Sequence, residues 1–328
     1  MESHAGTSPE RVLALASFAG ARAVLAAVEL DVFTALGEGA ATAGEVAERV
    51  GANPAAIQRL LLALRALGLV ALEGDEFRAA RDAARYLSRR SPDSLAEHFV
   101  AEAEAWEDWG RLPGVLRSGR PLRRATIFRD LSERTERLVL GLHARARASA
   151  AAVAEALDLR GVGHLLDLGG GAGTYAIELC RRYPTLRCTI FDLPAALRVA
   201  ERIVGESEAS PRIELVCGDF FVDKLGGPYG AAFASDVLHG NGVPENEALL
   251  ARVFQVLRPG GRLYLRDMFL HPVEAHPVEA ALLPLRILLD SDRGRPYGEE
   301  EVFGWLEAAG FREMRAIEPH TLLEARRP

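Results

Sequence analysis

The chain has 328 residues, of which 49% are hydrophobic and 26% are charged, so its composition excludes an intrinsically disordered protein. Its net charge of −7 argues against a nucleic-acid partner, because binding a polyanion requires a concentrated basic face. We therefore expect a small organic partner. The three cysteines, Cys180, Cys188 and Cys217, have no CxxC spacing, which predicts reduced, buried thiols and neither a disulfide nor a zinc site.

Residues 9 to 36 have the apolar spacing of one or two amphipathic helices. The stretch between Arg11 and Arg22 is similar to the apolar region of a signal peptide, but the helical pattern continues beyond Arg22. No uncharged run approaches the ~20 residues that span a bilayer, which predicts a soluble, cytoplasmic protein with no membrane partner. The apolar positions exceed what one neighbouring helix could cover, and this surplus indicates a partner chain.

The next segment has the order helix, turn, helix, hairpin, which is typical of a winged helix. Thr42 and Glu45 form a potential capping box for the first helix, and Pro54 is placed to start the second. The second helix is rich in leucine and offers only Arg59 and Arg65 to meet phosphates. This pattern favours a buried packing helix over a DNA reader, and we interpret the module as a dimerisation platform.

Residues 94 to 155 are predominantly helical in pattern, with an interruption at 118 to 121. Trp106 and Trp109 are three positions apart and so lie on one helix face. Core packing is the favoured interpretation, since large aromatic side chains are usually buried. The alternative is that they form a wall of an aromatic substrate pocket.

After Asp158 the pattern changes to alternating strands and helices. The expected strands are "HLLDL", "RCTIFDL", "IELVCGD", "AAFASDVL" and "GRLYLRDMF", and helical segments such as "TYAIELCRRY" separate them. This alternation predicts an α/β fold with a parallel, doubly wound sheet.

Glycines at 169, 171 and 173 follow the first of these strands, where they allow a sharp turn and close approach to a ligand. The segment "GAGTYA" also satisfies the dinucleotide pattern GxGxxA. Asp192 suits the ribose of either a dinucleotide or S-adenosylmethionine (SAM). Asp167 separates the two candidates, because a carboxylate there would repel a pyrophosphate and suits the ammonium and sulfonium groups of SAM.

Asp219 and Phe220 follow the third strand, where Asp219 could accept from an adenine amine while Phe220 covers the ring. Strand ends of a parallel sheet meet at one crevice, so these acids are expected to surround a common ligand. The alternative for each acid is a helix cap or a solvated turn.

His239 follows the fourth strand and precedes a glycine loop and a helix. Methyl transfer requires alignment of the partners and removal of the acceptor's proton. A phenol with a pKa near ~10 is little ionised at pH 7, so a neutral imidazole would assist as a general base. The alternative is a histidine that only caps the next helix.

Several segments of the chain resemble those of a known enzyme family. The segments "LLDLGGGAG", "FDLP", "CGDFF", "VLHGNGVPENEALL" and "LRPGGRLYLRD", preceded by "AERVGANPAAIQRLLLALRALGLV", are similar to the homodimeric, SAM-dependent small-molecule O-methyltransferases. That family includes plant caffeate and hydroxyindole enzymes and bacterial enzymes of polyketide and phenazine tailoring. The resemblance extends from about residue 10 to residue 325.

The resemblance implies three segments: a winged-helix dimerisation domain over 1–93, a helical linker that contributes to the substrate pocket over 94–155, and a Rossmann-like, class I methyltransferase domain over 156–328. It implies SAM as donor, S-adenosylhomocysteine (SAH) as product, and no metal. The expected reaction is methylation of a hydroxyl group on an aromatic or polyketide-like molecule.

The family's motifs also imply roles for individual residues. The expected donor contacts are Asp167, Gly169, Gly171, Asp192, Leu193, Asp219, Phe220 and Ser235. The resemblance assigns His239 as the base, oriented by Glu324 on the last strand, and places His143 at the substrate pocket. Trp106 is a further candidate for the substrate pocket, from its position on the tryptophan-bearing helix face.

The chain also departs from the family. The usual motif HDW is "HGNG" here, and Arg286 lies in the helix expected to carry a second orienting acid. An arginine near His239 would lower the pKa of the imidazole or could hold an acidic substrate. N-methylation, C-methylation or a changed reaction on a SAM-binding scaffold therefore remain alternatives. Two further alternatives are less favoured. One is an NAD-dependent reductase, for which this chain lacks a Tyr-x-x-x-Lys pair, and the other is a ligand-sensing regulator.

Overall fold

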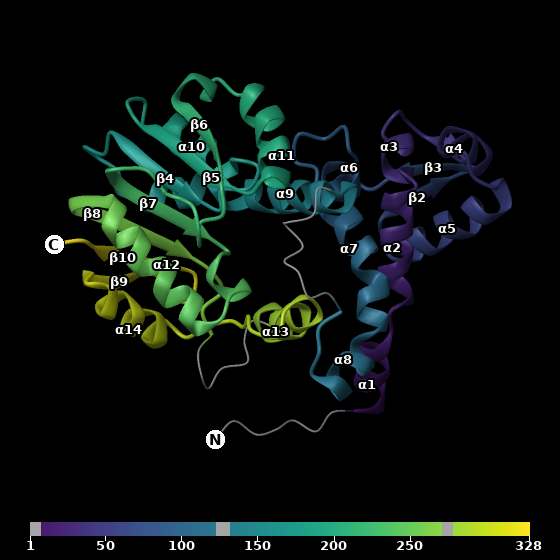
Figure 1. Cartoon of the computed structure of the whole chain (residues 1–328). Coiled ribbons are helices and arrows are strands. Elements are labelled where there is room, and N and C mark those ends of the chain that lie inside the picture. Colours follow the sequence, from purple (N-terminus) through teal and green to yellow (C-terminus); the bar gives the residue numbers. More distant parts are fainter. Residues whose placement is uncertain (1–7, 123–131, 271–277) are drawn as a thin grey trace. The chain divides into compact units, whose positions relative to one another are not determined.

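A computed structural model describes residues 8–122, 132–270 and 278–328 of the chain (Figure 1). The chain forms two compact units, Met1–Glu104 and Ala105–Pro328, and the division lies within helix α7 (Ala96–Gly110). Part of the helical segment expected over 94–155, namely 123–131, lies outside the described residues.

The first unit combines helices with a small sheet. Its elements are α1 (Pro9–Ala16), α2 (Ala19–Glu29), α3 (Val32–Leu36), β1 (Ala41–Thr42), α4 (Ala43–Val50), α5 (Pro54–Ala66), β2 (Val70–Glu73), β3 (Glu76–Ala79) and α6 (Arg81–Leu87). The capping box is confirmed, since Glu45 accepts from the Thr42 N–H at 2.7 Å and Thr42 accepts from the Glu45 N–H. The sheet order β1-β3-β2 completes the expected arrangement of helix, turn, helix and ribbon.

Helix α5 packs into the core of this unit, where Ile57, Leu61 and Leu64 are at most 2% exposed. Helix α1 behaves differently, because none of its residues is buried. The most exposed apolar side chains of α1 and the residues after it are Val12, Leu13, Leu15 and Phe18, each more than half exposed. The apolar surplus seen in the sequence therefore lies on α1.

The helical stretch Pro9–Glu29 is the one stretch in the described part of the chain that is long and apolar enough to cross a membrane by length and composition. It is interrupted at Ser17 and Phe18, where α1 ends and α2 has not begun. It also carries the charged side chains of Arg11 and Arg22. These features are typical of two surface helices of a globular unit.

The second unit is built on a seven-stranded sheet with the order β6-β5-β4-β7-β8-β10-β9. The strands are β4 (His164–Leu168), β5 (Arg187–Asp192), β6 (Ile213–Cys217), β7 (Tyr229–Ser235), β8 (Leu257–Arg266), β9 (Arg312–Glu318) and β10 (Leu322–Arg326). Strands β4 to β8 are parallel, whereas β9 and β10 pair antiparallel at one edge. The expected doubly wound α/β fold is confirmed, and its parallel strands are the five expected from the sequence.

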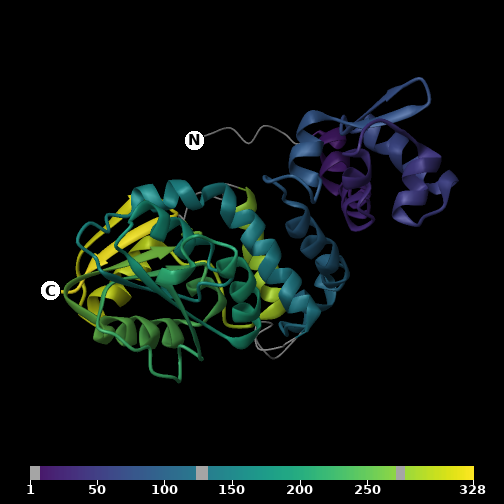
Figure 2. The same ribbon diagram turned by 90° about the horizontal axis from the view of Figure 1, so that it is seen from above.

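Helices cover both faces of this sheet (Figure 1; Figure 2). The helices of this unit after α7 are α8 (Leu112–Ser118), α9 (Glu133–Ala156), α10 (Thr174–Arg182), α11 (Pro194–Gly205), α12 (Val243–Val256), α13 (Val278–Asp290) and α14 (Glu299–Ala309). Helices α10 and α11 lie on one face, and α12 and α14 lie on the other (Figure 1). Successive strand residues alternate between the two resulting core layers, as Leu165 and Leu166 do in β4.

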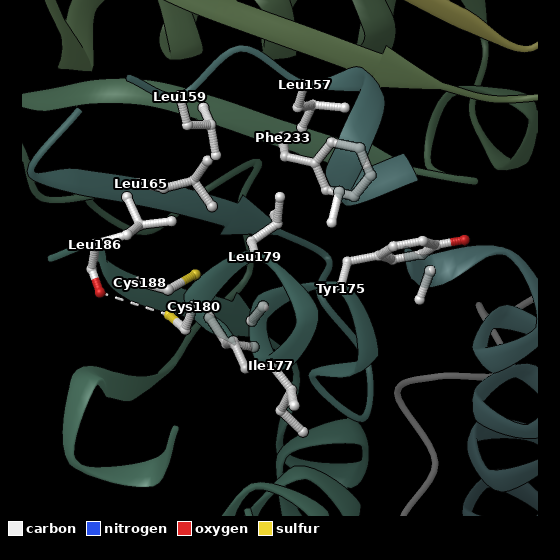
Figure 3. Close-up of a cluster of buried hydrophobic side chains, with 14 of the residues drawn as sticks. Leu157, Leu159, Leu165, Tyr175, Ile177, Leu179, Cys180, Leu186, Cys188 and Phe233 are labelled. Atoms are coloured by element: carbon white, nitrogen blue, oxygen red, sulfur yellow. Dashed lines mark hydrogen bonds between the residues drawn. The ribbon is translucent and has the colours of Figure 1, made fainter. Parts of the chain in front are cut away.

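One core layer lies between the sheet and helices α9 and α10 (Figure 3). In this layer the ring of Tyr175 meets the ring of Phe233 edge-on, with 5.1 Å between their centroids. Cys180 and Cys188 are buried in it as free thiols, as expected. Cys217 is exposed, contrary to expectation, because it ends the edge strand β6.

The parallel strands end at one edge of the sheet. Asp192, Ser235 and Arg266 are the last residues of β5, β7 and β8, and the glycine loop follows Leu168 of β4. Open α/β sheets bind ligands at this edge, so the fold brings the residues singled out in the sequence to a common place.

Candidate functional site

The glycine loop after β4 folds tightly around Asp167. Gly169 has a φ of +68°, in the left-handed region that side chains rarely adopt. A Cβ on Gly170 would lie 2.6 Å from Oδ2 of Asp167, so no side chain fits there. The loop backbone thus closely approaches the carboxylate, which requires glycine.

Asp167 is 1% exposed, and its Oδ2 has no hydrogen-bond partner among the described residues. Burial, followed by the neighbouring carboxylate of Asp192, raises the pKa of Asp167 to about 7. A buried carboxylate oxygen without a partner is costly in a folded protein. The arrangement fits a cationic ligand group that would pair with this oxygen.

Asp192 is bonded to the same loop. Its Oδ2 accepts from the N–H of Gly171 at 2.8 Å, and its Oδ1 accepts from the N–H of Leu193 at 2.7 Å. Burial raises the pKa of Asp192 although both N–H donors favour the carboxylate. Asp192 therefore ties the glycine loop to the start of α11, and each oxygen keeps lone pairs for a further donor.

Asp219 stabilises a turn, as expected from the alternative to a ligand-binding role that the sequence left open. Its Oδ1 accepts from the N–H of Phe221 at 2.9 Å. The ring of Phe220 lies beside the glycine loop, 3.7 Å from where a Cβ of Gly169 would be. The turn organised by Asp219 thus places an aromatic ring next to the loop.

His239 is hydrogen-bonded to an acid that the sequence did not single out. Its Nδ1 lies 2.7 Å from Oδ1 of Asp267, which is 4% exposed. The other oxygen of Asp267 accepts from the backbone N–H groups of Leu238 and His239, at 3.1 and 3.3 Å. With Nδ1–H donating to the carboxylate, Nε2 is the basic nitrogen, and it has no partner among the described residues.

The charge balance around His239 favours the imidazolium. Burial opposes protonation, but Asp267 and then Asp236 outweigh it, so the pKa of His239 lies above its ordinary value. The cation that acts against this rise is Arg145 of α9. Of the two effects that the sequence left open for an arginine near His239, a lowered pKa is therefore not observed, because two carboxylates lie near the imidazole.

The role expected for Glu324 is corrected as well. Glu324 accepts from Nε of Arg315 at 2.7 Å and lies 3.7 Å from Nε of Arg262. Glu324 of β10 pairs with Tyr264 of β8, and Tyr264 lies three residues before Asp267 in the chain. Tyr264 belongs to the core layer opposite the one that contains Leu238, which precedes His239. Glu324 therefore stabilises the sheet, and Asp267 is the acid bonded to the imidazole.

Arg286 is paired within its own helix. It forms an ion pair with Asp290, one turn later in α13, at 2.5 Å. The positive charge that acts on the pKa of His239 is that of Arg145, which was not singled out in the sequence. No sequence spacing could have indicated it, since it lies on a helix far from His239 along the chain.

His143 lies next to the glycine loop. Its Nδ1 is 2.8 Å from Oγ1 of Thr174, the first residue of α10. Burial, followed by the charge of Arg147, lowers the pKa of His143 to about 4, so the imidazole is neutral at pH 7. A cavity of about 220 Å³ opens beside it between α9, α10 and the end of α11.

Trp106 is partly buried on α7. Two residues later, the buried Asp108 forms a 2.5 Å ion pair with Arg134 and so fastens α7 to α9. This ion pair holds the tryptophan-bearing turn of α7 against the start of α9.

Ser235 takes part in a polar cluster. Its Oγ donates to Asp236 at 2.8 Å and accepts from Arg266 at 3.2 Å, while Arg266 pairs with Asp236 at 3.0 Å. The ligand atoms of Asp236, His239 and Asp267 lie within 4.8 Å of one another, close enough for a metal ion. Hydrogen bonds and ion pairs within the protein account for all three groups, so the cluster does not require a cation.

Comparison with known proteins identifies two family domains and related enzymes. Residues 13–89 match the O-methyltransferase dimerisation domain, and residues 124–312 match the O-methyltransferase domain. The chain is 34% identical to the tetracenomycin polyketide synthesis 8-O-methyl transferase TcmO of Streptomyces glaucescens, over 95% of this chain and 94% of the relative. It is 32% identical to the 3-hydroxy-5-methyl-1-naphthoate 3-O-methyltransferase of Streptomyces sahachiroi, over 89% of this chain and 86% of the relative.

Solved structures agree over the whole chain. Human N-acetylserotonin methyltransferase in complex with SAM matches with a TM-score of 0.87 and 25% identity, covering 99% of both chains. The mitomycin 7-O-methyltransferase MmcR matches with a TM-score of 0.84 and 26% identity, covering 97% of both chains. These matches leave no place for the reductase and the regulator that the sequence kept as alternatives. The chain belongs to the family of SAM-dependent O-methyltransferases.

Proposed function

We propose that the protein transfers the methyl group of SAM to a hydroxyl group of an aromatic or polyketide-like small molecule, with His239 as general base and SAH as the other product. The observation that carries this proposal is the pairing of His239 with Asp267 at 2.7 Å, at the sheet edge that also bears the glycine loop. TcmO and the naphthoate O-methyltransferase, which act on such molecules by their names, support the acceptor class.

The residues around the glycine loop fit the donor. SAM, when bound, supplies a methyl group activated by a positively charged sulfur. The unpartnered oxygen of Asp167 suits the cationic methionine end of SAM, and Asp192 suits the ribose hydroxyls. Phe220 lies where it would cover the adenine. The other proposed donor contacts are Gly169, Gly171, Leu193, Asp219 and Ser235.

His239 would remove the proton of the acceptor hydroxyl through Nε2. Asp267 keeps the other proton on Nδ1 and stabilises the imidazolium that forms, because its carboxylate accepts the Nδ1–H bond. The raised pKa makes the imidazole a stronger base than an ordinary histidine. His143 and Trp106 are proposed to line the acceptor side of the pocket.

The test is turnover of a naphthol by wild-type protein and His239→Ala, with SAM affinity measured by isothermal titration. General-base catalysis contributes about 10²- to 10⁴-fold, so we expect a loss of that size in kcat with an unchanged Kd for SAM. Arg160→Ala is the control and should keep full activity, because Arg160 is exposed in the loop before β4, at the opposite end of that strand from the glycine loop. Equal rates for wild type and His239→Ala would refute the assignment of the base.

N-methylation is the second candidate. The chain is 29% identical to the N,N-dimethyltransferase OxyT of Streptomyces rimosus, over 92% of this chain and 90% of the relative. A base such as His239 could equally accept a proton from an attacking amine. Naphthol and naphthylamine acceptors with the same substitution separate the two, since faster turnover of the amine would favour N-methylation.

We further propose a cytoplasmic homodimer formed through the first unit. The match to the dimerisation domain and the exposed apolar side chains of α1 support this assembly. Sedimentation analysis of the purified protein tests it, and a monomer at micromolar concentration would contradict it.

A further inference from the structure

Gly294 lies against the backbone of the proposed base. It belongs to the loop between α13 and α14, residues 291–298, and it contacts the base turn, residues 238–242. A Cβ at position 294 would overlap the carbonyl oxygen of His239 and would lie 2.9 Å from the carbonyl carbon of Gly240. The φ of Gly294 is not in the left-handed region, so its backbone conformation would accept other residues. The contact with the base turn is therefore what requires glycine here.

The 291–298 loop is anchored to the base turn by Tyr297. Its hydroxyl donates to the carbonyl oxygen of Asn241 at 2.5 Å, and its ring packs edge-on against Trp305 of α14, with 4.8 Å between the centroids. An ion pair of 2.5 Å also joins Arg293 to Glu245 in the first turn of α12, but Arg293 is exposed, so this pair contributes little. Tyr297 itself is buried, so its hydrogen bond is the stronger of the two links.

The other side of the base turn is held by Asp267 and Asn246. Asp267 accepts from the backbone N–H groups of Leu238 and His239, and it bonds Nδ1 of His239 at 2.7 Å. The buried Asn246 donates to the carbonyl oxygen of Leu238 at 3.0 Å. The backbone of His239 therefore lies between Asp267, which bonds its N–H, and Gly294, which contacts its carbonyl. A displacement at either side would change the distance between the imidazole and Asp267.

We propose that Gly294 is a positioning residue of the base. By packing without a side chain on the carbonyl of His239, it allows the turn to hold the imidazole at hydrogen-bond distance from Asp267. This inference rests on the proposed function, because it concerns the same base. No flexible neighbour could make room for a larger residue, since the atoms around position 294 are the backbone of the turn and the buried Ile287 of α13, 3.0 Å away. The loop and the turn would have to separate.

The first experiment compares turnover of a naphthol by wild type and Gly294→Ala. A misplacement of about 1 Å can reduce a rate about 10²-fold, so we expect kcat to fall about 10- to 100-fold. The Kd for SAM, measured by isothermal titration, should not change, because the 291–298 loop is not among the proposed donor contacts. The matched control is Gly304→Ala on α14, where the added Cβ would meet no atom within 4 Å, and it should keep full activity.

A second readout separates positioning from a loss of stability. Protonation of the His239 imidazole is followed by NMR in protein with labelled histidine, and the spectrum of His239→Ala identifies its signal. Burial and the charge of Arg145 lower the pKa of His239, whereas Asp267 and Asp236 raise it. If Gly294→Ala lengthens the bond to Asp267, this pKa should fall, whereas a merely destabilised variant would keep the wild-type pKa. An unchanged pKa of His239 in Gly294→Ala would overturn the proposal.

Tyr297→Phe keeps the test decisive if Gly294→Ala does not fold. The variant retains the ring packed on Trp305 and removes only the hydroxyl that bonds Asn241. A hydrogen bond of this kind contributes enough for a change of about 2- to 10-fold, so kcat should fall by that factor and the pKa of His239 should fall as well. With Gly294→Ala unfolded, wild-type values of both quantities in Tyr297→Phe would overturn the proposal.

The NMR titration requires no methyl transfer, so this proposal and the proposed function can fail separately. If the pKa of His239 falls in Gly294→Ala but wild type methylates no hydroxyl acceptor, the positioning role stands and the proposed reaction fails. If wild type methylates naphthol and Gly294→Ala has the wild-type pKa, the proposed reaction stands and the positioning role fails.

Discussion

Replacing Asp167 by asparagine should stabilise the ligand-free protein and abolish SAM binding. The Asp167 carboxyl is 1% exposed and one of its oxygens has no partner among the described residues, so its negative charge is costly to bury. Asparagine has nearly the same shape and carries no charge. The residue would thus be kept for the ligand at the expense of stability.

The size of the effect follows from the pKa. Raising a carboxyl pKa from 3.8 to about 7 corresponds to a loss of about 4 kcal/mol in the free energy of unfolding at pH values above 7. The sign follows from proton binding, because folded Asp167 holds its proton at a pH where the unfolded chain has lost it. The cost is absent below pH 3.8, grows between pH 3.8 and about 7, and is constant above.

The assay is urea unfolding of wild type and Asp167→Asn at a series of pH values between 4 and 8, without SAM, combined with isothermal titration of SAM. The variant should gain stability relative to wild type as pH rises, and the gain should level off above pH 7. Asp75→Asn, in the exposed turn between β2 and β3, is the control and should show no such trend. A stability difference independent of pH, or SAM binding by the variant at wild-type affinity, would refute the reasoning.

Three further predictions concern other parts of the molecule. Asp267→Asn should lower kcat by about 10²-fold or more and shift the acidic limb of the pH–rate profile to lower pH, because His239 loses the carboxylate that raises its pKa; an unshifted limb would contradict the pairing. Gly170→Ala should abolish SAM binding in an isothermal titration, since its Cβ would lie 2.6 Å from the carboxylate of Asp167; retained affinity would show that the loop can relax. Leu13→Asp on α1, where this side chain is 72% exposed, should shift sedimentation toward a monomer without altering the circular dichroism spectrum, and an unchanged assembly would exclude α1 from the interface.

Local patterns in the sequence were sufficient for the strands of the sheet and for the place where Asp167 and Asp192 meet. The capping box at Thr42 and the five strand segments depend on residues within a few positions of one another, which the sequence displays directly. Asp167 and Asp192 could be placed together in advance because the parallel connection of their strands puts all carboxyl ends at one edge. The same rule applied to "GRLYLRDMF" would have indicated Asp267, which follows the last residue of its strand.

Only the tertiary structure decided which charged groups surround the base. The acid on His239 is Asp267 and not Glu324, because the ladder between β8 and β10 pairs Glu324 with Tyr264, away from the strand end. The cation that acts on the pKa of His239 is Arg145, which no sequence spacing indicated. The sequence alone thus determined the elements and the edge at which they meet, since both follow from local periodicity and chain connection. Contacts between side chains far apart in the chain depend on strand register and helix rotation, which exist only in the folded protein.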